Sequence, residues 1–264
     1  MREHAMKGRN AIVTGSTSGI GLAIARALAA EGCNVMLNGL GDAGEIEAVR
    51  ADLAASAGTK IAYHGADVSR PTEVRALVAA ARAEMGPADI LVNNAGIQHV
   101  SALADFPDEQ WDRLVAVNLS AAFHASKAVI GSMTERRFGR IVNIASVLGL
   151  VGAPHKAAYV ATKHGLVGLT KSIAIEVAET GVTCNAVCPG MVMTPIIEMQ
   201  VADQAKVTGL SPEDVVKEVF LQNQPIRRPV TAEEIAGAVV FLCSPAGSGV
   251  TGTTLAVDGG YVAR

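Results

Sequence analysis

Short strand-like segments alternate with helix-like segments along the whole of this 264-residue chain. The strand-like segments are apolar runs, and the segments between them have the longer apolar spacing that is typical of helices. We expect strands at 10–14, 33–38, 60–64, 89–93, 140–145, 182–188 and 253–257, with helices ending near 31 and covering 42–57, 71–86, 107–137, 156–180 and 231–243. This alternation predicts an α/β fold, a parallel doubly wound sheet of about seven strands with helices on both faces.

The composition fits one domain with a large buried sheet. Half of the residues are hydrophobic and only 18% are charged, as expected when helices cover both faces of a sheet. No linker, repeat or low-complexity tract divides the chain, so we expect a single domain over residues 1–264. Within it, residues 189–228 lack strand character and are polar in stretches, which predicts a lid over a substrate.

Charge and residue spacing disfavour several classes of protein. The net charge of -3 gives no basic surface for nucleic acid. No apolar run approaches the roughly 20 residues of a membrane span, and the polar start lacks a signal-peptide core, which predicts a cytoplasmic protein without a membrane partner. The four cysteines form no CxxC pair and the six histidines have no metal-ligand spacing, so we expect free thiols and no metal site.

A glycine-rich turn follows the first expected strand and opens the first helix. It reads Thr14-Gly15-Ser16-Thr17-Ser18-Gly19-Ile20-Gly21. Glycines at these positions permit a tight turn and let the backbone approach a pyrophosphate at the helix N-terminus. The turn therefore predicts a Rossmann-type dinucleotide site. Asp67-Val68 follows the third strand, where the Asp either accepts a hydrogen bond from adenine or caps a helix.

The choice between NAD and NADP depends on the residues after the second strand. The segment Asn38-Gly39-Leu40-Gly41-Asp42 has no obvious acidic residue for the ribose 2′-hydroxyl of NAD. It also has no Arg or Lys for the 2′-phosphate of NADP, and neither does the glycine turn. Because both segments lack a cation for the 2′-phosphate of NADP, we expect NAD as the cofactor.

Three polar residues predict proton chemistry at the same edge of the sheet. Ser146 lies just beyond the fifth strand, where open α/β sheets bind ligands. Tyr159 and Lys163 are spaced i, i+4 and share one helix face. A lysine near a phenol lowers its pKa, and such a tyrosine exchanges a proton with an alcohol, while a serine hydroxyl stabilises charge on the same oxygen. Seen alone, a Tyr-x-x-x-Lys pair is also common on helix surfaces.

The ordered set of motifs resembles the short-chain dehydrogenase/reductase family over the whole chain. The matching stretches are Thr14-Gly15-x3-Gly19-x-Gly21, Asn93-Asn94-Ala95-Gly96, Asn118, Ser146, Tyr159-x3-Lys163 and Pro189-Gly190-x3-Thr194. The resemblance implies that Tyr159 is the acid/base, that Ser146 holds the substrate oxygen, that Lys163 binds the nicotinamide ribose and that Asn118 anchors a proton-relay water. The cofactor contacts that it implies are Gly15, Thr17, Ser18, Gly19, Ile20, Gly21, Asp67, Val68, Asn94, Tyr159, Lys163, Pro189, Gly190, Val192 and Thr194.

Within that family the chain most resembles bacterial D-3-hydroxybutyrate dehydrogenases. The matching stretches are Leu37-Asn38-Gly39, Asn93 to Gln98, Lys156-x2-Tyr159, Lys163-His164-Gly165, Thr194-Pro195-x4-Gln200 and Val257-Asp258-Gly259-Gly260. The resemblance implies that Gln98, Lys156 and Gln200 hold a substrate carboxylate, beside Ser146 and Tyr159, and a cation with amide donors suits that group.

The chain departs from the resembled enzymes at three positions. It has Leu148 where they usually have His, Met191 where Trp follows Pro-Gly, and Tyr261 where Trp is usual. These changes remove one polar substrate contact and much aromatic bulk, so the expected substrate extends to a longer or 4-hydroxy acid.

The leading hypothesis is an NAD-dependent oxidoreductase that interconverts a short 3-hydroxy acid, best D-3-hydroxybutyrate, and its oxo acid, acetoacetate. Alternatives are a 3-oxoacyl-carrier reductase or a sugar or alcohol dehydrogenase of the same family, and a non-enzymatic NAD sensor. Long helices rich in Ala, Val and Ile at 107–137 and 156–180 resemble those that pair in tetrameric relatives, which predicts a homotetramer.

Overall fold

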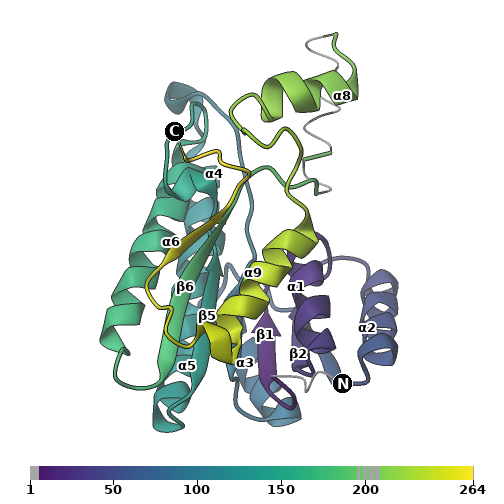
Figure 1. Ribbon diagram of the computed structural model, residues 1–264, viewed down its shortest axis with the longest axis vertical. Coiled ribbons are helices and arrows are strands. Elements are labelled where there is room, and N and C mark those ends of the chain that lie inside the picture. Colours follow the sequence, from purple (N-terminus) through teal and green to yellow (C-terminus); the bar gives the residue numbers. More distant parts are fainter. Residues whose placement is uncertain (1–5, 195–196, 199–200, 202–204, 206–208, 264) are drawn as a thin grey trace.

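The computed structural model describes residues 6–194, 197–198, 201, 205 and 209–263. Its centre is one parallel sheet in the order β3-β2-β1-β4-β5-β6-β7, which confirms the predicted doubly wound α/β fold (Figure 1). The strands are β1 (Asn10–Val13), β2 (Asn34–Asn38), β3 (Ile61–His64), β4 (Ile90–Asn93), β5 (Gly139–Ile144), β6 (Val182–Pro189) and β7 (Thr254–Val257).

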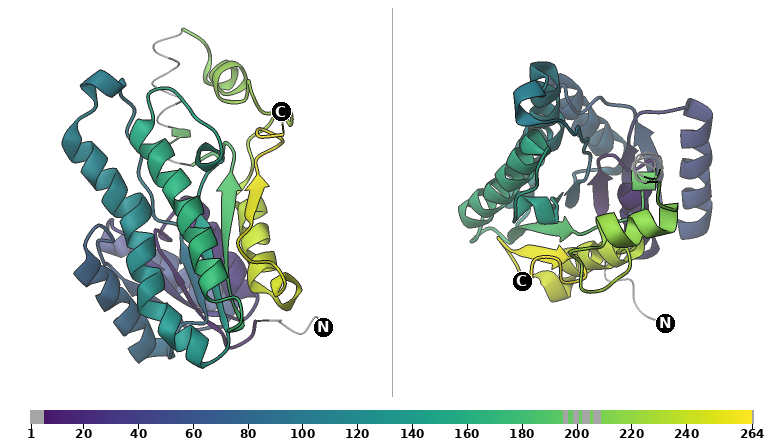
Figure 2. Two further views of the ribbon diagram at one scale, coloured as in Figure 1. Left: turned by 90° about the vertical axis from the view of Figure 1, so that its left-hand side faces the viewer. Right: turned by 90° about the horizontal axis from the view of Figure 1, so that it is seen from above.

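Helices cover both faces of this sheet (Figure 2). The helices α1 (Gly19–Ala30), α2 (Ala43–Ala57) and α9 (Ala232–Cys243) lie on one face, and α3 (Pro71–Met85), α5 (Ala121–Glu135) and α6 (Ala157–Glu176) lie on the other. The short helices α4 (Asp108–Val115) and α8 (Pro212–Val215) lie beyond the sheet's carboxyl edge.

The sheet separates two hydrophobic cores. Every residue of β1, β4, β5 and β6 is buried, as expected for strands covered on both faces. Successive residues of β1 alternate between the cores: Val13 packs with Ile24 of α1 on one side, and Ile12 packs with Leu77 of α3 on the other. Burying apolar area on both faces stabilises the fold by roughly 25 cal/mol per Å².

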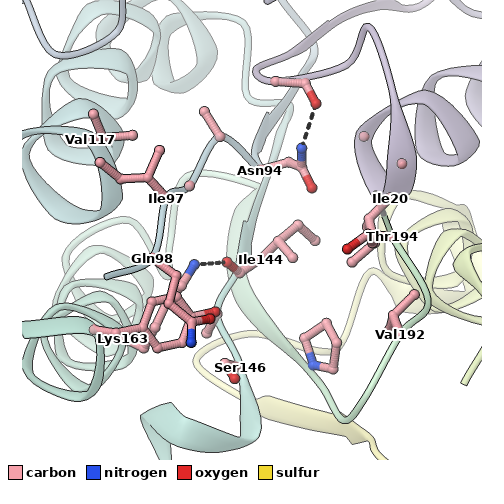
Figure 3. Close-up of a pocket in the computed structure, with 18 of the residues that line it drawn as sticks. Ile20, Asn94, Ile97, Gln98, Val117, Ile144, Ser146, Lys163, Val192 and Thr194 are labelled. Atoms are coloured by element: carbon pink, nitrogen blue, oxygen red, sulfur yellow. Dashed lines mark hydrogen bonds between the residues drawn. The ribbon is translucent and has the colours of Figure 1, made fainter. Parts of the chain in front are cut away.

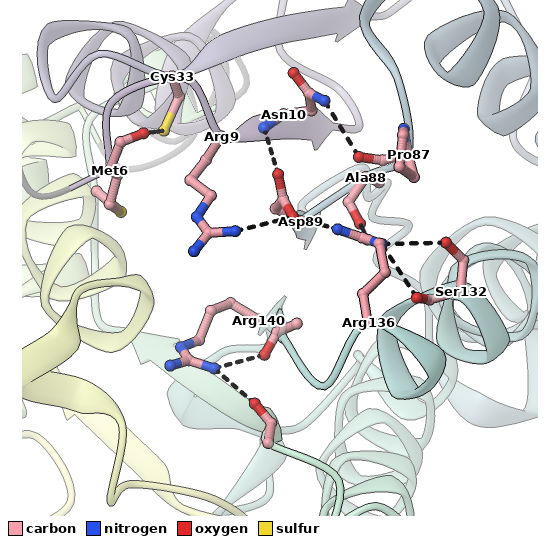
Figure 4. Close-up of polar contacts among 12 residues, drawn as sticks. Met6, Arg9, Asn10, Cys33, Pro87, Ala88, Asp89, Ser132, Arg136 and Arg140 are labelled. Atoms are coloured by element: carbon pink, nitrogen blue, oxygen red, sulfur yellow. Dashed lines mark hydrogen bonds and ion pairs between the residues drawn. The ribbon is translucent and has the colours of Figure 1, made fainter.

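The amino edge of the sheet is tied together by a carboxylate. Asp89 precedes β4 and accepts a hydrogen bond from the backbone N–H of Asn10 at 3.0 Å (Figure 4). The guanidinium groups of Arg136 and Arg9 lie 2.5 Å and 3.4 Å from the Asp89 carboxylate. These contacts join β1, β4 and the end of α5 at the edge opposite the glycine turn.

Three segments differ from the sequence expectation. The helix expected over 107–137 is interrupted between α4 and α5 by a wider π-helical turn, Ala116–Ser120. Pro189 belongs to β6, and Val192 forms a bridge with Val230, so the segment expected to be a lid begins with extended backbone. Helix α6 ends at Glu176, because the backbone leaves helical geometry at Val177.

By length and composition alone, the continuous helical stretch Asp108–Glu135 is apolar enough to cross a membrane. In the fold, 44% of its apolar window is buried, and α5 packs against α3 and β4. That packing is typical of a core helix.

Candidate active site

The strand order reverses between β1 and β4, and a cavity of about 660 Å³ opens at the carboxyl ends of these strands. Such a switch point is where open α/β sheets bind ligands. The cavity is lined by the glycine turn and by residues that follow β2, β3, β4, β5 and β6. Figure 3 shows several of these side chains pointing into it.

The glycine turn is locked against the loop that follows β4. Thr14 Oγ1 accepts hydrogen bonds from the backbone N–H groups of Asn94 at 3.0 Å and Ala95 at 3.1 Å. In return, Asn94 Nδ2 donates to the carbonyl oxygens of Thr14 at 2.9 Å and Gly15 at 2.8 Å. Gly15 has φ +61°, and a Cβ there would lie 2.9 Å from the Ala95 Cα, so a side chain does not fit.

The start of α1 has the features of a phosphate site. No described side chain caps α1, although Ser18 is its N-cap, and its first turn contains no acidic residue. At Gly21 a Cβ would overlap the carbonyl oxygen of Gly15. The helix dipole and the uncapped N–H groups of the first turn favour an anion at this end of the cavity. A dinucleotide pyrophosphate fits this cradle, and Thr17, Gly19 and Ile20 also line it.

Asn38, at the end of β2, supports the wall that would hold the adenosine. Its Oδ1 accepts from the Gly15 N–H at 3.3 Å, and its Nδ2 donates to the carbonyl oxygens of His64 at 3.0 Å and Ala66 at 2.9 Å. No sequence motif assigned a role to Asn38. The available signal was a buried amide at the carboxyl end of an apolar strand.

Asp67 and Val68 line the same end of the cavity. Asp67 also closes a turn before α3, because its Oδ1 accepts from the Ser69 N–H at 2.9 Å. Hydrogen bonds from Ser69 hold the pKa of the Asp67 carboxyl below its usual value, and the charges of Arg70 and Arg113 lower it further. The two expectations for Asp67, capping and ligand binding, are compatible here. Arg113 of α4 lines the cavity as well and was not singled out from the sequence.

The structure brings Ser146, Tyr159 and Lys163 together at the other end of the cavity. Ser146 follows β5, and its Oγ accepts from the Leu148 N–H at 3.1 Å. Tyr159 and Lys163 lie one turn apart on α6, and Lys163 is buried. Lys163 Nζ donates to the Ile144 carbonyl oxygen at 2.8 Å (Figure 3).

The pKa shifts at this end differ from the sequence expectation for the phenol. Burial raises the pKa of Tyr159, and a hydrogen bond with Ser146 opposes the rise. Lys163 Nζ, which the sequence predicted to lower this pKa, donates its hydrogen bond to Ile144 and lies 5.6 Å from the phenol ring centroid. Burial lowers the pKa of Lys163 to about 8. The charge of the neighbouring Cys188 opposes this lowering.

Asn118 lies in the π-helical turn and holds the loop after β4. Its Oδ1 accepts from the Ile97 N–H at 2.8 Å, and its Nδ2 donates to the Ile97 carbonyl oxygen at 2.9 Å and to Thr162 Oγ1 at 3.3 Å. π-Helical turns inside longer helices are frequent at functional sites. Here the turn lets one asparagine contact both a loop and α6.

Two of the three residues expected to bind the substrate carboxylate lie among the described residues. Gln98 and Lys156 line the cavity with Ser146 and Tyr159. Gln98 Nε2 is buried, and among the described residues it has no hydrogen-bond partner. Burial lowers the pKa of Lys156. Gln200 lies outside the described residues.

The remaining expected contacts come from the segment after β6. The cavity-lining residues among them are Pro189, Gly190, Val192 and Thr194. A Cβ at Gly190 would lie 2.8 Å from the Asp258 Cα, so the backbone passes close to the end of β7. Leu148, Met191 and Tyr261, the three departures from the resembled enzymes, also line the cavity.

Metal-ligand geometry is not found in the described part of the chain, where no group of three or more His, Cys, Asp or Glu side chains could hold an ion. The four cysteines are buried and free. The polar side-chain groups that the described cavity wall offers include a phenol, hydroxyls, ammonium groups, amides, the Asp67 carboxylate and the Arg113 guanidinium.

A family model described as Enoyl-(Acyl carrier protein) reductase matches residues 15–262. A D-beta-hydroxybutyrate dehydrogenase of Rhizobium meliloti is 48% identical over 97% of this chain and 99% of its own, and one of Cupriavidus necator is 48% identical over 98% of this chain and 100% of its own. The crystal structure of an actinorhodin polyketide ketoreductase variant with NADPH superposes with a TM-score of 0.90, at 41% identity, covering 96% of this chain and 97% of that one.

Proposed function

Because the chain belongs to the short-chain dehydrogenase/reductase family, whose members use a nicotinamide cofactor, we propose that it is an NAD-dependent 3-hydroxy acid dehydrogenase. Its best substrate pair is D-3-hydroxybutyrate and acetoacetate. The two relatives named D-beta-hydroxybutyrate dehydrogenase support this choice, since each matches nearly the full chain.

The observation that carries the proposal is the polar pair beside the phenol. Gln98 Nε2 is a buried donor without a partner among the described residues, and leaving such a group unpaired costs about 1–3 kcal/mol. Lys156 is a partly buried ammonium on the same wall. A carboxylate satisfies both groups at once, because it accepts hydrogen bonds and carries the opposite charge. Gln200 belongs to the same proposed contact set.

In the proposed reaction, a nicotinamide bound in the cavity would provide the hydride donor or acceptor for C3 of the acid. As a phenolate, Tyr159 Oη takes the proton of the C3 hydroxyl during oxidation, and as a phenol it gives a proton to the substrate oxygen during reduction. Ser146 Oγ donates a hydrogen bond to the same substrate oxygen and stabilises the charge that develops on it. Lys163 holds the nicotinamide ribose, and Asn118 anchors the water that relays the proton. Lys156 and Gln98 orient the carboxylate.

NAD is proposed over NADP from the wall that follows β2. There the cavity is lined by Asn38, Gly39 and Leu40, and the Leu40 side chain is 67% exposed. Among the described residues that line this wall, a 2′-phosphate meets no cation. The basic residues of the cavity come from other elements: Arg113 of α4, with Lys156 and Lys163 at α6.

A 3-oxoacyl-carrier reductase is the second candidate, favoured by the similarity to the NADPH-bound ketoreductase. It differs from the first candidate in two measurable properties. It needs NADPH, and it does not need a site for a substrate carboxylate. A non-enzymatic NAD sensor, the third reading, has no use for Ser146 and Tyr159 beside the cavity. A sugar or alcohol dehydrogenase likewise leaves Lys156 unexplained.

The oligomeric state, the cellular location and the role of the segment after β6 are also proposals. We propose a cytoplasmic homotetramer without nucleic acid or membrane partners, with the 189–228 segment acting as a substrate lid. Apolar side chains on the outer faces of α5 and α6 support pairing of these helices, since Phe123 is 45% and Ile175 is 80% exposed.

One assay tests the function directly. Reduction of NAD is measured with both enantiomers of 3-hydroxybutyrate, and oxidation of NADPH is measured with a 3-oxoacyl thioester. The proposal expects turnover of the D acid with NAD. Turnover of the thioester with NADPH, and of neither acid, contradicts it and selects the second candidate.

A further inference from the structure

Arg113 is a cation of the cavity wall that the proposed chemistry does not use. It lies on α4, one turn before Val117, and both residues line the cavity with Asp67 and Val68. Figure 3 shows Val117 next to Ile97 at one side of the cavity. The Arg113 side chain is exposed, and within the described residues its guanidinium makes no hydrogen bond or ion pair.

Arg70 provides a comparison at the same carboxylate. Its Nε lies 3.8 Å from Asp67 Oδ2, and its Nη1 lies 3.1 Å from Glu73 Oε1. Arg70 and Arg113 both act electrostatically on Asp67. Only Arg113 belongs to the cavity wall. One guanidinium is therefore engaged outside the cavity, and the other is placed to meet a ligand within it.

We propose that Arg113 is a cofactor-positioning residue whose guanidinium covers the adenine ring of the bound dinucleotide. This rests on the proposed function. Adenine is a flat aromatic ring, and a guanidinium, which is planar and weakly hydrated, stacks on such a ring. Asp67 supplies an acceptor for the adenine amine, and Val68 and Val117 supply apolar walls.

The other charged parts of the cofactor are accommodated elsewhere. The pyrophosphate belongs at the N-terminus of α1, where the helix end is uncapped among the described residues. The ribose 2′ position belongs at Gly39 and Leu40, which follow β2. The end of the cavity that Arg113 shares with Asp67 is therefore left for the adenine.

The test compares Arg113→Ala with Arg70→Ala, a matched removal of a guanidinium beside Asp67. The Kd of NADH is measured by fluorescence titration without substrate. We expect Arg113→Ala to raise this Kd about three- to fivefold, the size of an exposed cation–π contact, with Arg70→Ala unchanged. Arg113→Lys keeps the positive charge but lacks the planar guanidinium, so we expect its Kd for NADH to rise as well.

Three results overturn the inference. An unchanged Kd in Arg113→Ala shows that the side chain does not touch the cofactor. Equal rises in Arg113→Ala and Arg70→Ala show that both act only through Asp67. A rise confined to NADPH, with NADH unaffected, assigns Arg113 to a 2′-phosphate. If the wild-type protein binds neither NADH nor NADPH, the proposed function fails as well, which separates that outcome from the other three.

Discussion

The backbone N–H of Ser101 donates to the carbonyl oxygen of His155 at 3.0 Å. This bond joins the loop that carries Gln98 to the residue just before Lys156. His155 has φ +61°, a left-handed conformation that is uncommon outside glycine. Non-glycine residues in that conformation cluster at functional sites. We interpret the bond as the link that sets the distance between the two residues proposed to bind the carboxylate.

Removing that N–H should weaken substrate binding. In Ser101→Pro the donor is lost, whereas Ser101→Ala keeps it and serves as the control. One hydrogen bond is worth about 1 kcal/mol, so we expect the KM for 3-hydroxybutyrate to rise roughly fivefold in Ser101→Pro alone. The Kd of NADH, measured by titration, should not change. Equal KM values in the two variants contradict the link.

Tyr159→Phe tests the proposed proton transfer. We expect kcat to fall by at least about a hundredfold, the usual contribution of a positioned acid or base. NADH binding should persist, because the phenol oxygen serves the substrate oxygen. Stopped-flow and titration data separate the two effects. A variant that keeps most of its kcat removes Tyr159 from the mechanism.

Lys163 predicts how stability depends on pH. Its pKa is about 8 in the folded protein and near 10.5 in a model peptide, so between these values the unfolded chain binds more protons. Stability should therefore rise with pH, by about 1 kcal/mol between pH 7 and pH 9 from this group. The control is Lys163→Met, which should lack the rise in urea titrations at both pH values. An identical pH dependence in the two proteins contradicts the shifted pKa.

Leu148 tests the length of the substrate. Its side chain lines the cavity beside Ser146 and offers no hydrogen bond. We expect Leu148→His to favour the four-carbon acid over the five-carbon acid, because it adds a donor for the carboxylate and removes apolar surface worth about 0.8 kcal/mol per methylene. The measurement is the ratio of kcat/KM for the two acids. An unchanged ratio means that Leu148 does not contact the substrate.

Local sequence patterns predicted the sheet and the identity of much of the candidate site. The glycine turn, Ser146, Tyr159 and Lys163 are recognisable because turn geometry and helical spacing are properties of neighbouring residues. What the patterns missed depends on tertiary contacts. Asn38 and Arg113 meet the cavity through packing of distant elements, and the π-helical turn at Asn118 has no spacing signal. The burial of Tyr159 also follows from packing, which is why the pKa of the phenol is raised where the sequence predicted a lowering.

The central claim is that the cavity recognises a hydroxy acid by its carboxylate. The most direct measurement is the ratio of kcat/KM for D-3-hydroxybutyrate to that for its methyl ester, in the wild-type protein and in Lys156→Gln. We predict that the wild-type protein prefers the acid by about a hundredfold or more, and that Lys156→Gln lowers this ratio at least about tenfold, because the Lys156 ammonium is the cation proposed to pair with the carboxylate. An ester that is turned over as well as the acid, with a ratio that does not change in Lys156→Gln, contradicts the account.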